Sequence, residues 1–402
     1  MATIIIKPQD VERVVGQKSE NSSLAAAYFK NRPLHNSTHI SATELKREYG
    51  NVPVVLRGDS GIRPKHGVGV SDIVPMPIEI DDMIRATEMD DYERATEMGK
   101  QQIVDQYISE HFDMVRNTIN ALCCQAHKGE INYMMKSGAD LVKYHVSYGS
   151  VQTVQFGTYL GKLNMTKAVF DLTKLATLVR KRVGGDIEFI AAADVYAKMV
   201  ALLEAAKKED NVRDGYLMLG SYKVYQDNDS YVDTDANGNK VTKSLCGTGE
   251  IVCRAVNAGQ KLPFCKLDDT VQREAVPFYS FTEEGDGHRG TAIYSKSKPF
   301  PLPNLKGIAW GRYEIEQYAV TFSAGSNGTL TAKVDGQSIT TGDTVPEGTL
   351  VYLYPTPSSG YEFKAWSGTD AADVVAIGDG VYTLLIDKAK TVQATFDTAA
   401  AG

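Results

Sequence analysis

Near the middle of the chain, oxygen-bearing side chains alternate with the spacing of a calcium loop. Asp233, Asp235 and Asn237 precede Gly238, as in the first half of an EF-hand loop. The twelfth position of that loop needs a bidentate glutamate, and Ser244 stands there instead. The flanking segments alternate like strands, whereas an EF-hand has flanking helices. The pattern therefore favours a hairpin turn over a cation site.

A second group could bind a soft metal through sulfur and nitrogen. Cys123, Cys124 and His127 lie within five residues on a predicted helix, and Cys123 and His127 share a face. No other cysteine or histidine cluster supplies the remaining ligands at a recognisable spacing. We interpret the group as buried side chains at the edge of an apolar stripe. The sequence thus predicts no metal and no cofactor.

The acidic residues Glu283, Glu284 and Asp286 gather with His288 around two glycines. Such a loop could hold a general acid–base pair, although a solvated turn is favoured. The sequence has neither a Gly-x-Ser-x-Gly nucleophile elbow nor a Gly-rich phosphate loop ending in Lys-Ser/Thr. With no catalytic constellation, the chain is predicted not to be an enzyme and to have a structural or binding role.

Residues 51–78 are punctuated by glycine and proline and are predicted to form an extended, hairpin-like loop. Its charged residues Arg57, Asp59, Arg63 and Lys65 are the candidates for contact between subunits. The tripeptide beginning at Arg57 also matches a motif that some adhesion receptors recognise, but three residues recur by chance. Solubility alone is the alternative explanation for the basic residues.

The elements that would position these residues begin with one long helix. Apolar residues from Val104 to Ala126 repeat in steps of three and four, which predicts a helix over 100–127 about 40 Å long. A compact α/β lobe over 139–206 follows. There, Asp171 is expected to cap a helix that ends at Gly184-Gly185, and Asp194 to cap a second.

The 402 residues suggest two or three domains, and the formal charge of −7 disfavours a dedicated nucleic-acid-binding protein. The charge is uneven, because residues 319–402 carry 4 lysines against 9 acidic residues. This last part lacks Cys, Arg, His and Met, and it alternates like short strands around a single Trp366. We therefore divide the chain into an arm (1–50), a main domain (51–317) and an all-β module (318–402).

The apolar segments and the cysteines indicate where the chain is made. No signal peptide or bilayer span is predicted, because the apolar run at the start is short and the longest later one contains charges. Five cysteines without regular spacing favour reduced thiols and synthesis in a cytoplasm.

The order of these parts resembles the major capsid protein of tailed phages, in the family of the lambda-type capsid protein E. The resemblance covers roughly residues 45–316 and rests on three stretches: Asp72 to Ile80, the 100–127 helix with Lys128-Gly129, and Ile293 to Pro303. It implies an α+β fold, the tailed-phage and herpesvirus (Hong Kong 97-like) capsid fold, with a spine helix, an extended loop and a peripheral and axial lobe.

The resemblance also implies a function. Copies of the chain would form hexamers and pentamers of an icosahedral shell, with the loop lying over one neighbour and the N-terminal arm reaching another. The shell would enclose double-stranded DNA without sequence-specific binding, and a separate scaffolding protein is expected because residues 1–45 show no coiled pattern. The protein would reside in the virion after assembly in the host cytoplasm, without contacting a membrane.

The last part resembles an internalin B-repeat module, a compact β-grasp-like unit. The matching residues include Val320 to Phe322, Gly360 to Phe363, Trp366 and Val392 to Phe396. On a capsid such a module would sit outside as decoration. Two other functions stay open: a surface adhesin that carries the module as a binding repeat, and an enzyme with a site near Asp286 and His288.

Overall fold

The computed structural model describes residues 4–18, 23–41, 72–84, 86–137, 140–234, 239–284, 291–334 and 336–399. Most of the predicted loop 51–78, with Arg57, Asp59, Arg63 and Lys65, lies outside these residues. The chain divides into two compact units, one of Met1–Val154 with Met165–Arg312 and one of Gln155–Asn164 with Tyr313–Gly402.

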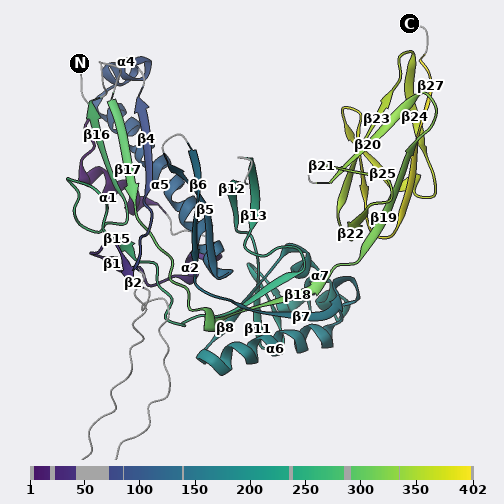
Figure 1. Cartoon of the computed structure of the whole chain (residues 1–402), viewed down its shortest axis with the longest axis horizontal. Helices are drawn as coiled ribbons and strands as arrows, with labels where there is room; N and C mark the ends of the chain where they lie inside the picture. The colour runs from purple at the N-terminus through teal and green to yellow at the C-terminus, as the bar shows by residue number, and fades with distance from the viewer. Residues whose placement is uncertain are drawn as a thin grey trace, which may run out of the picture. The chain divides into compact units, whose positions relative to one another are not determined.

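Within its described residues, the first unit contains one long helix, α5 (Glu97–His127), which α1 (Pro8–Gln17), α2 (Leu24–Tyr28) and α4 (Ala86–Arg94) contact, and two helices that pack elsewhere, α6 (Met165–Val183) and α7 (Ala193–Ala205). Figure 1 shows α1 and α2 beside α5. None of the described helices is long and apolar enough to cross a membrane.

Helix α5 confirms the strongest expectation from the sequence. It begins three residues before the predicted start, where the Thr96 hydroxyl accepts a hydrogen bond from the Gly99 N–H at 3.2 Å. Its predicted stripe is buried, with Ile108 and Val115 almost fully inaccessible. Gly129, at φ +90°, ends it as expected.

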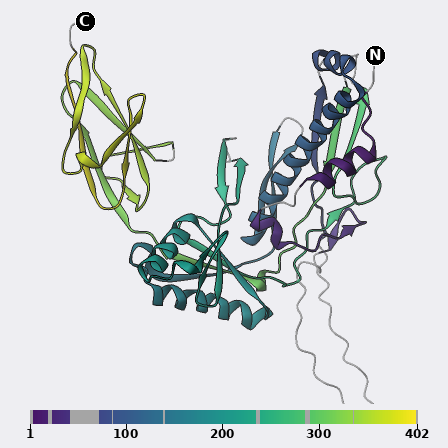
Figure 2. The same cartoon turned by 180° about the vertical axis from the view of Figure 1, so that it is seen from behind.

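A small sheet and a hairpin lie against α5. The three-stranded sheet has the order β16-β17-β4, and its strands run alongside the helix in both Figure 1 and Figure 2. The bounds are β4 (Ile78–Ile84), β16 (Tyr279–Glu284) and β17 (Thr291–Ser297). The hairpin pairs β5 (Glu130–Ser137) with β6 (Asp140–Ser147).

Four two-residue strands form two short pairs in this unit. β1 (Leu34–His35) pairs in parallel with β15 (Phe264–Cys265), and β2 (Ile40–Ser41) pairs antiparallel with β3 (Asp72–Ile73). The segments on either side of residues 42–71 are therefore held together at their bases.

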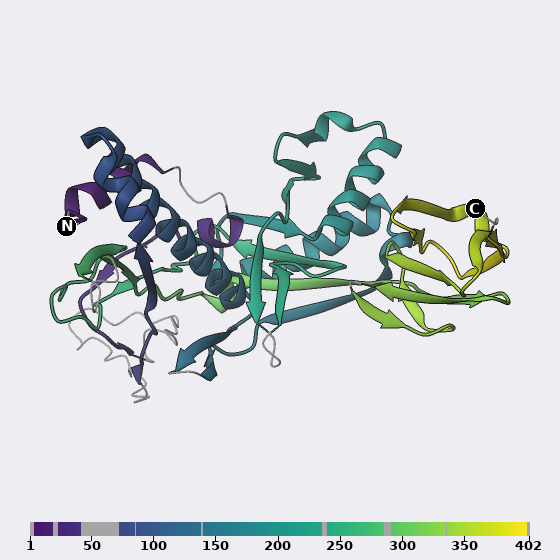
Figure 3. The same ribbon diagram turned by 90° about the horizontal axis from the view of Figure 1, so that it is seen from above.

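A seven-stranded mixed sheet forms the α/β part of the first unit, in the order β7-β18-β14-β8-β11-β10-β9. Its strands are β7 (Gln152–Tyr159), β8 (Ile187–Ala191), β9 (Val212–Arg213), β10 (Tyr216–Leu219), β11 (Tyr222–Gln226), β14 (Glu250–Ala255) and β18 (Ile308–Glu314). β8 and β11 are parallel and joined through α7, whereas β14 is antiparallel to both of its neighbours β8 and β18. Helices α6 and α7 pack on the sheet, as Figure 3 shows from above.

Two helix caps predicted in this lobe are wrong. Asp171 lies inside α6, not before it, where it is 1% exposed and pairs with Lys167 one turn earlier at 3.2 Å. Helix α7 is preceded by Ala192, so Asp194 stands in the first turn. The predicted end of α6 is confirmed, because Gly184 and the next glycine both have positive φ.

The N-terminal segment is not the irregular arm that its polarity suggested. Ala25, Ala26 and Phe29 are fully buried against α5, and Ile40 is fully buried as well. The apolar residues are too few and too scattered to give a periodic signal. The expectation that residues 1–50 stay outside the core is therefore wrong for these residues.

The second unit is all β, as the alternating pattern predicted, and its strands form two sheets that pack on each other. The four-stranded sheet has the order β22-β19-β27-β24 and the five-stranded sheet β21-β20-β23-β26-β25. The strands are β19 (Gln317–Ala324), β20 (Gly328–Val334), β21 (Gln337–Ile339), β22 (Thr344–Pro346), β23 (Leu350–Pro357), β24 (Tyr361–Ser367), β25 (Val374–Gly378), β26 (Val381–Leu385) and β27 (Lys390–Thr398). The first strand β19 runs parallel to the last, β27.

The core of this unit is aliphatic and lies between the two sheets. Its fully buried members include Val320, Val351, Leu353 and Leu384. Trp366, the predicted anchor, is partly buried and packs at the edge of this core, with its ring centroid 5.2 Å from that of Tyr382. Aliphatic side chains from both sheets, more than the tryptophan, thus hold the module together.

Residues from before α6 pack into the same unit. The rings of Phe156 and Tyr313 lie 4.6 Å apart, and the Lys162 ammonium pairs with the Glu316 carboxylate. No local pattern in the sequence predicts this contact, because it joins segments about 150 residues apart.

Candidate functional site

A buried arginine fastens the N-terminal segment to the end of the long helix. Arg254, on β14, is 2% exposed and donates hydrogen bonds to the Glu188 carboxylate at 2.7 Å and to the Leu24 carbonyl at 2.8 Å. A third hydrogen bond runs from its Nη1 to Nε2 of His127 at 3.2 Å. The guanidinium also lies 4.9 Å from the ring centroid of Tyr28. The charge is therefore paired and hydrogen-bonded, as a buried cation must be.

His127 is held in one neutral form by this arrangement. Its Nδ1 donates to the Cys123 carbonyl at 2.7 Å, so Nε2 is the acceptor for Arg254. Complete burial, together with the neighbouring guanidinium, lowers the pKa of His127 to about 3. Both ring nitrogens are occupied by hydrogen bonds, so the imidazole is not available as a metal ligand.

The neighbouring cysteines are buried side chains, as the sequence favoured. Cys123 and Cys124 are both fully inaccessible, and burial raises the pKa of each thiol. Among the described residues, no group of three or more His, Cys, Asp or Glu side chains could hold a metal ion.

Asp229, which follows β11, binds the N-terminal end of the short helix α2, and Asp227 holds the loop that carries Asp229. Asp229 accepts hydrogen bonds from the Leu24 and Ala25 N–H groups at 3.1 and 2.6 Å, at the helix N-terminus. Asp227 accepts from the Cys246 N–H at 2.7 Å and from the Asp229 N–H at 3.0 Å. Burial raises the pKa of Asp227 to about 6. The N-terminal segment is thus tied to the body at both ends of α2.

An open depression of about 360 Å³ lies where the parallel strands β8 and β11 end and α7 begins. Asp194 and Asp227 line it, a position where α/β sheets often bind ligands. However, Asp194 accepts from the Gly249 N–H at 2.8 Å, and Asp227 is occupied as described above. Both carboxylates therefore accept hydrogen bonds from the backbone of the loops around them.

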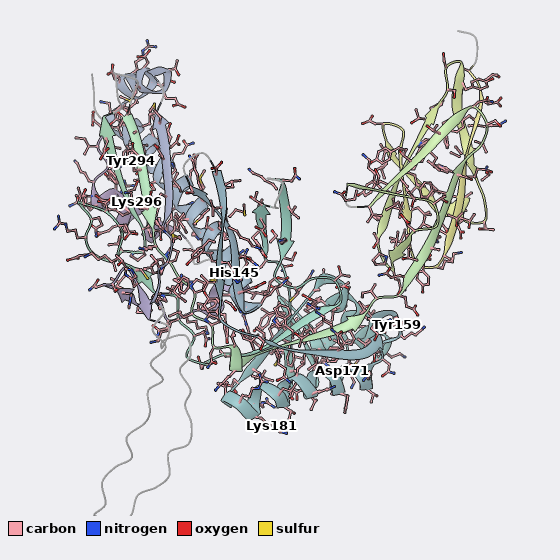
Figure 4. The ribbon with its side chains drawn as sticks, viewed as in Figure 1. His145, Tyr159, Asp171, Lys181, Tyr294 and Lys296 are labelled. Atoms are coloured by element: carbon pink, nitrogen blue, oxygen red, sulfur yellow. The ribbon has the colours of Figure 1, made fainter. Side chains whose placement is uncertain are left out.

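Some of the exposed apolar residues of the first unit lie on or beside the β5–β6 hairpin. Leu141 and Val142 are 53% and 42% exposed, and Val74 and Met76 are nearly as accessible. Val74 and Met76 line an open depression of about 380 Å³ with His145, which Figure 4 labels, and Tyr144, whose hydroxyl donates to the Val74 carbonyl. Within the described residues, β5 and β6 pair only with each other. We call this surface the hairpin face.

The remaining predicted residues do not assemble into a catalytic group. Glu283 and Glu284 are on β16, in register with β17, while Asp286 and His288 lie outside the described residues. Asp233 pairs across the predicted hairpin with Lys243, and the antiparallel register of β12 (Ser230–Thr234) and β13 (Lys240–Ser244) confirms that hairpin. The intervening Asp235 and Asn237 lie outside the described residues.

The sequence analysis did not identify Arg254 as a functional residue, although a charged residue in an apolar segment is a recognisable signal. The residue interrupts the otherwise apolar run of Ile251, Val252 and Cys253 in a strand that is buried along its whole length. A charge in such a strand must be paired, and its partners can be identified only from the fold.

Comparisons with known proteins agree with this architecture. The model of the family described as phage major capsid protein E matches residues 13–310. A second model, the divergent InlB B-repeat domain, matches residues 318–400. A search of curated protein sequences found no match.

Among solved structures, similarity extends over most of the chain. A protein assigned as a prophage capsid protein of Escherichia coli CFT073 has a TM-score of 0.52 at 14% identity, covering 78% of this chain and all of the other. A phage-related protein of Bordetella bronchiseptica RB50 has a TM-score of 0.44 at 11% identity, covering 78% and 98%. The capsid of the cyanophage P-SCSP1u has a TM-score of 0.41 at 11% identity, covering 74% of this chain and 90% of the other. Of these three, the first has a TM-score above 0.5 and establishes the shared fold.

Proposed function

The chain belongs to the family of phage major capsid protein E, and we propose that its copies close into an icosahedral head shell built of hexamers and pentamers. It is a structural shell protein. The match to that family over residues 13–310 is the observation that carries this function. The alternative of a surface adhesin is not favoured, because the match covers the body and not merely the repeat module.

The hairpin face supports contact between copies in the shell. Exposed apolar side chains such as Leu141 and Val142 gain from being covered. Shell subunits meet through large shared surfaces, not through a pocket. The hairpin face therefore packs on a neighbouring subunit.

The loop residues Arg57, Asp59, Arg63 and Lys65 remain the candidates for a second contact. The strands β2 and β3 pair the described residues on either side of this segment. The basic residues would meet acidic groups on the neighbour over which the loop lies.

The module of residues 318–402 serves as an outward decoration. Its excess of acidic residues would repel packaged DNA, which favours the outer side of the wall. The module matches its own family model over residues 318–400, and its composition differs from that of the body.

The other partners follow from the shell function. A separate scaffolding protein would set the curvature during assembly in the host cytoplasm, and the finished shell would enclose double-stranded DNA without reading its sequence. The protein would act without catalysis and without a cofactor.

Negative-stain electron microscopy tests this function on purified protein, with and without a co-expressed scaffold. Closed shells, tubes or capsomer rings are expected. A protein that stays monomeric under all conditions would contradict the proposal.

A further inference from the structure

Helix α6 carries a group of exposed cations. Lys174, Arg180, Lys181 and Arg182 are all exposed, and none of them forms an ion pair within the described residues. The one carboxylate of the helix, Asp171, is buried and paired as described above. Figure 4 labels Lys181 near the end of the helix and Asp171 in its first half.

Lys174 and Lys181 lie on the side of α6 that points away from the sheet. Arg180 and Arg182 flank that side, and the Arg180 guanidinium lies 5.9 Å from the ring centroid of Tyr222. Lys174, Thr177 and Lys181 follow one another in steps of three and four, so they share one side of the helix. Leu172 and Leu175 are fully buried on the opposite side. At 1.5 Å per residue, the two lysines stand roughly 10 Å apart along the axis. We call this side the basic face.

Stabilisation of the helix end explains part of this charge. Cations in the last turn interact favourably with the partial negative charge at a helix C-terminus, and Arg180, Lys181 and Arg182 are in that turn. Lys174 lies more than two turns before the end, beyond the range of that effect. Five cations against one carboxylate in the helix also contrast with the overall charge of −7.

We propose that the basic face binds the phosphate backbone of duplex DNA, without reading sequence. The proposal rests on the proposed function, because it assumes that the shell encloses DNA. Duplex DNA carries one negative charge per about 1.7 Å of its axis, so a straight row of cations can neutralise several phosphates at once. Lysine, arginine and threonine are typical phosphate contacts.

The same face fits an acidic protein less well. A protein interface needs a buried apolar centre, and the basic face offers one exposed apolar side chain, Phe170. The Lys167 ammonium lies 5.2 Å from the centroid of that ring. Charge without an apolar centre is typical of phosphate binding.

Fluorescence anisotropy with a labelled 30-base-pair duplex tests the proposal on the full chain. The variant combines Lys174→Gln, Arg180→Gln, Lys181→Gln and Arg182→Gln. The control removes four exposed cations elsewhere in the same unit, by Arg94→Gln, Lys207→Gln, Lys208→Gln and Lys240→Gln. Circular dichroism verifies that both variants are folded.

We expect the four-site variant to bind DNA at least about fivefold more weakly at 100 mM salt. The slope of log affinity against log salt should fall by about 3 relative to the wild type, since about 0.9 is lost per phosphate contact. The control should stay within about twofold of the wild type. Equal losses in both variants, or no loss in the four-site variant, would overturn the proposal.

Two further measurements separate the possible failures. Polyglutamate replaces DNA as the probe, and binding of polyglutamate but not DNA would assign the face to an acidic protein instead. Electron microscopy of the same samples reports assembly independently. Shells that form while DNA binding is insensitive to the four substitutions would overturn the inference and leave the proposed function standing, whereas absence of shells counts against the proposed function itself.

Discussion

Arg254 and His127 meet inside the first unit, with the guanidinium Nη1 3.2 Å from the imidazole Nε2. A protonated imidazole could not accept this hydrogen bond, so the contact requires a neutral histidine. Arg254 also bonds the Leu24 carbonyl, and the pair therefore joins the N-terminal segment, the long helix α5 and the seven-stranded sheet. The integrity of three separate parts of the unit thus depends on one cation.

Replacing Arg254 by methionine is expected to lower the free energy of unfolding of the first unit by about 3–5 kcal/mol, because Glu188 and the Leu24 carbonyl lose their buried partner. Urea unfolding followed by Trp310 fluorescence measures this in a Trp366→Phe background, so that the signal comes from the first unit alone. Arg94→Met, at an exposed helix position, is the control and should change stability by less than about 0.5 kcal/mol. Similar effects of the two substitutions would show that the buried guanidinium is not structural.

Stability should depend on pH through His127. Its pKa is lowered to about 3 in the folded chain, against 6.5 for the free side chain, so the unfolded chain binds more protons between these values. The unfolding free energy therefore falls as pH decreases below about 6.5, with a slope of up to about 1.4 kcal/mol per pH unit. Asp227 has the opposite effect on the unfolding free energy. Its pKa is raised to about 6 in the folded chain, so its protonation stabilises the fold as pH decreases below about 6.

His127→Gln separates the two contributions. Glutamine can donate and accept hydrogen bonds but does not titrate, so the variant should lose less stability than the wild type between pH 6.5 and 4.5. Urea unfolding at several pH values in this range measures both proteins. Parallel pH profiles would show that His127 protonates in the folded state without penalty.

The sequence predicted what depends on local pattern and missed what depends on distant contacts. Helix 100–127, the end of α6 at Gly184 and the strands of the second unit follow from periodicity and glycine, and the structure confirms them. The prediction of Asp171 as a helix cap is wrong. Aspartate favours the N-cap position, but α6 begins six residues before Asp171. Burial of the N-terminal segment depends on Arg254 and Asp229, more than 200 residues away.

Gly129→Ala should destabilise the first unit more than Gly184→Ala. Both positions have positive φ, which costs about 1–2 kcal/mol for alanine. At Gly129 the added Cβ would also lie 2.5 Å from the Gly149 carbonyl oxygen, whereas at Gly184 it meets nothing within 4 Å. Thermal unfolding of the two variants gives the comparison. A larger loss at Gly184 would contradict the described end of α5.

A chain that ends at Gln317 should still assemble, with smoother particles, because residues 318–402 form their own core. The ring contact of Phe156 with Tyr313 and the ion pair of Lys162 with Glu316 are kept in this shorter chain. Electron microscopy of the truncated and full chains measures the difference. Loss of assembly on truncation would show that the module is part of the wall.

Assembly through the hairpin face tests the central claim most directly. Electron microscopy and sedimentation of the purified chain should show shells, tubes or capsomer rings, and Leu141→Asp with Val142→Asp should reduce the assembled fraction at least about tenfold without unfolding the monomer. The control Val375→Asp with Ile377→Asp places the same charges on exposed apolar positions of the second unit and should leave assembly unchanged. A wild-type chain that remains monomeric at every concentration, with or without a scaffold, would contradict the account.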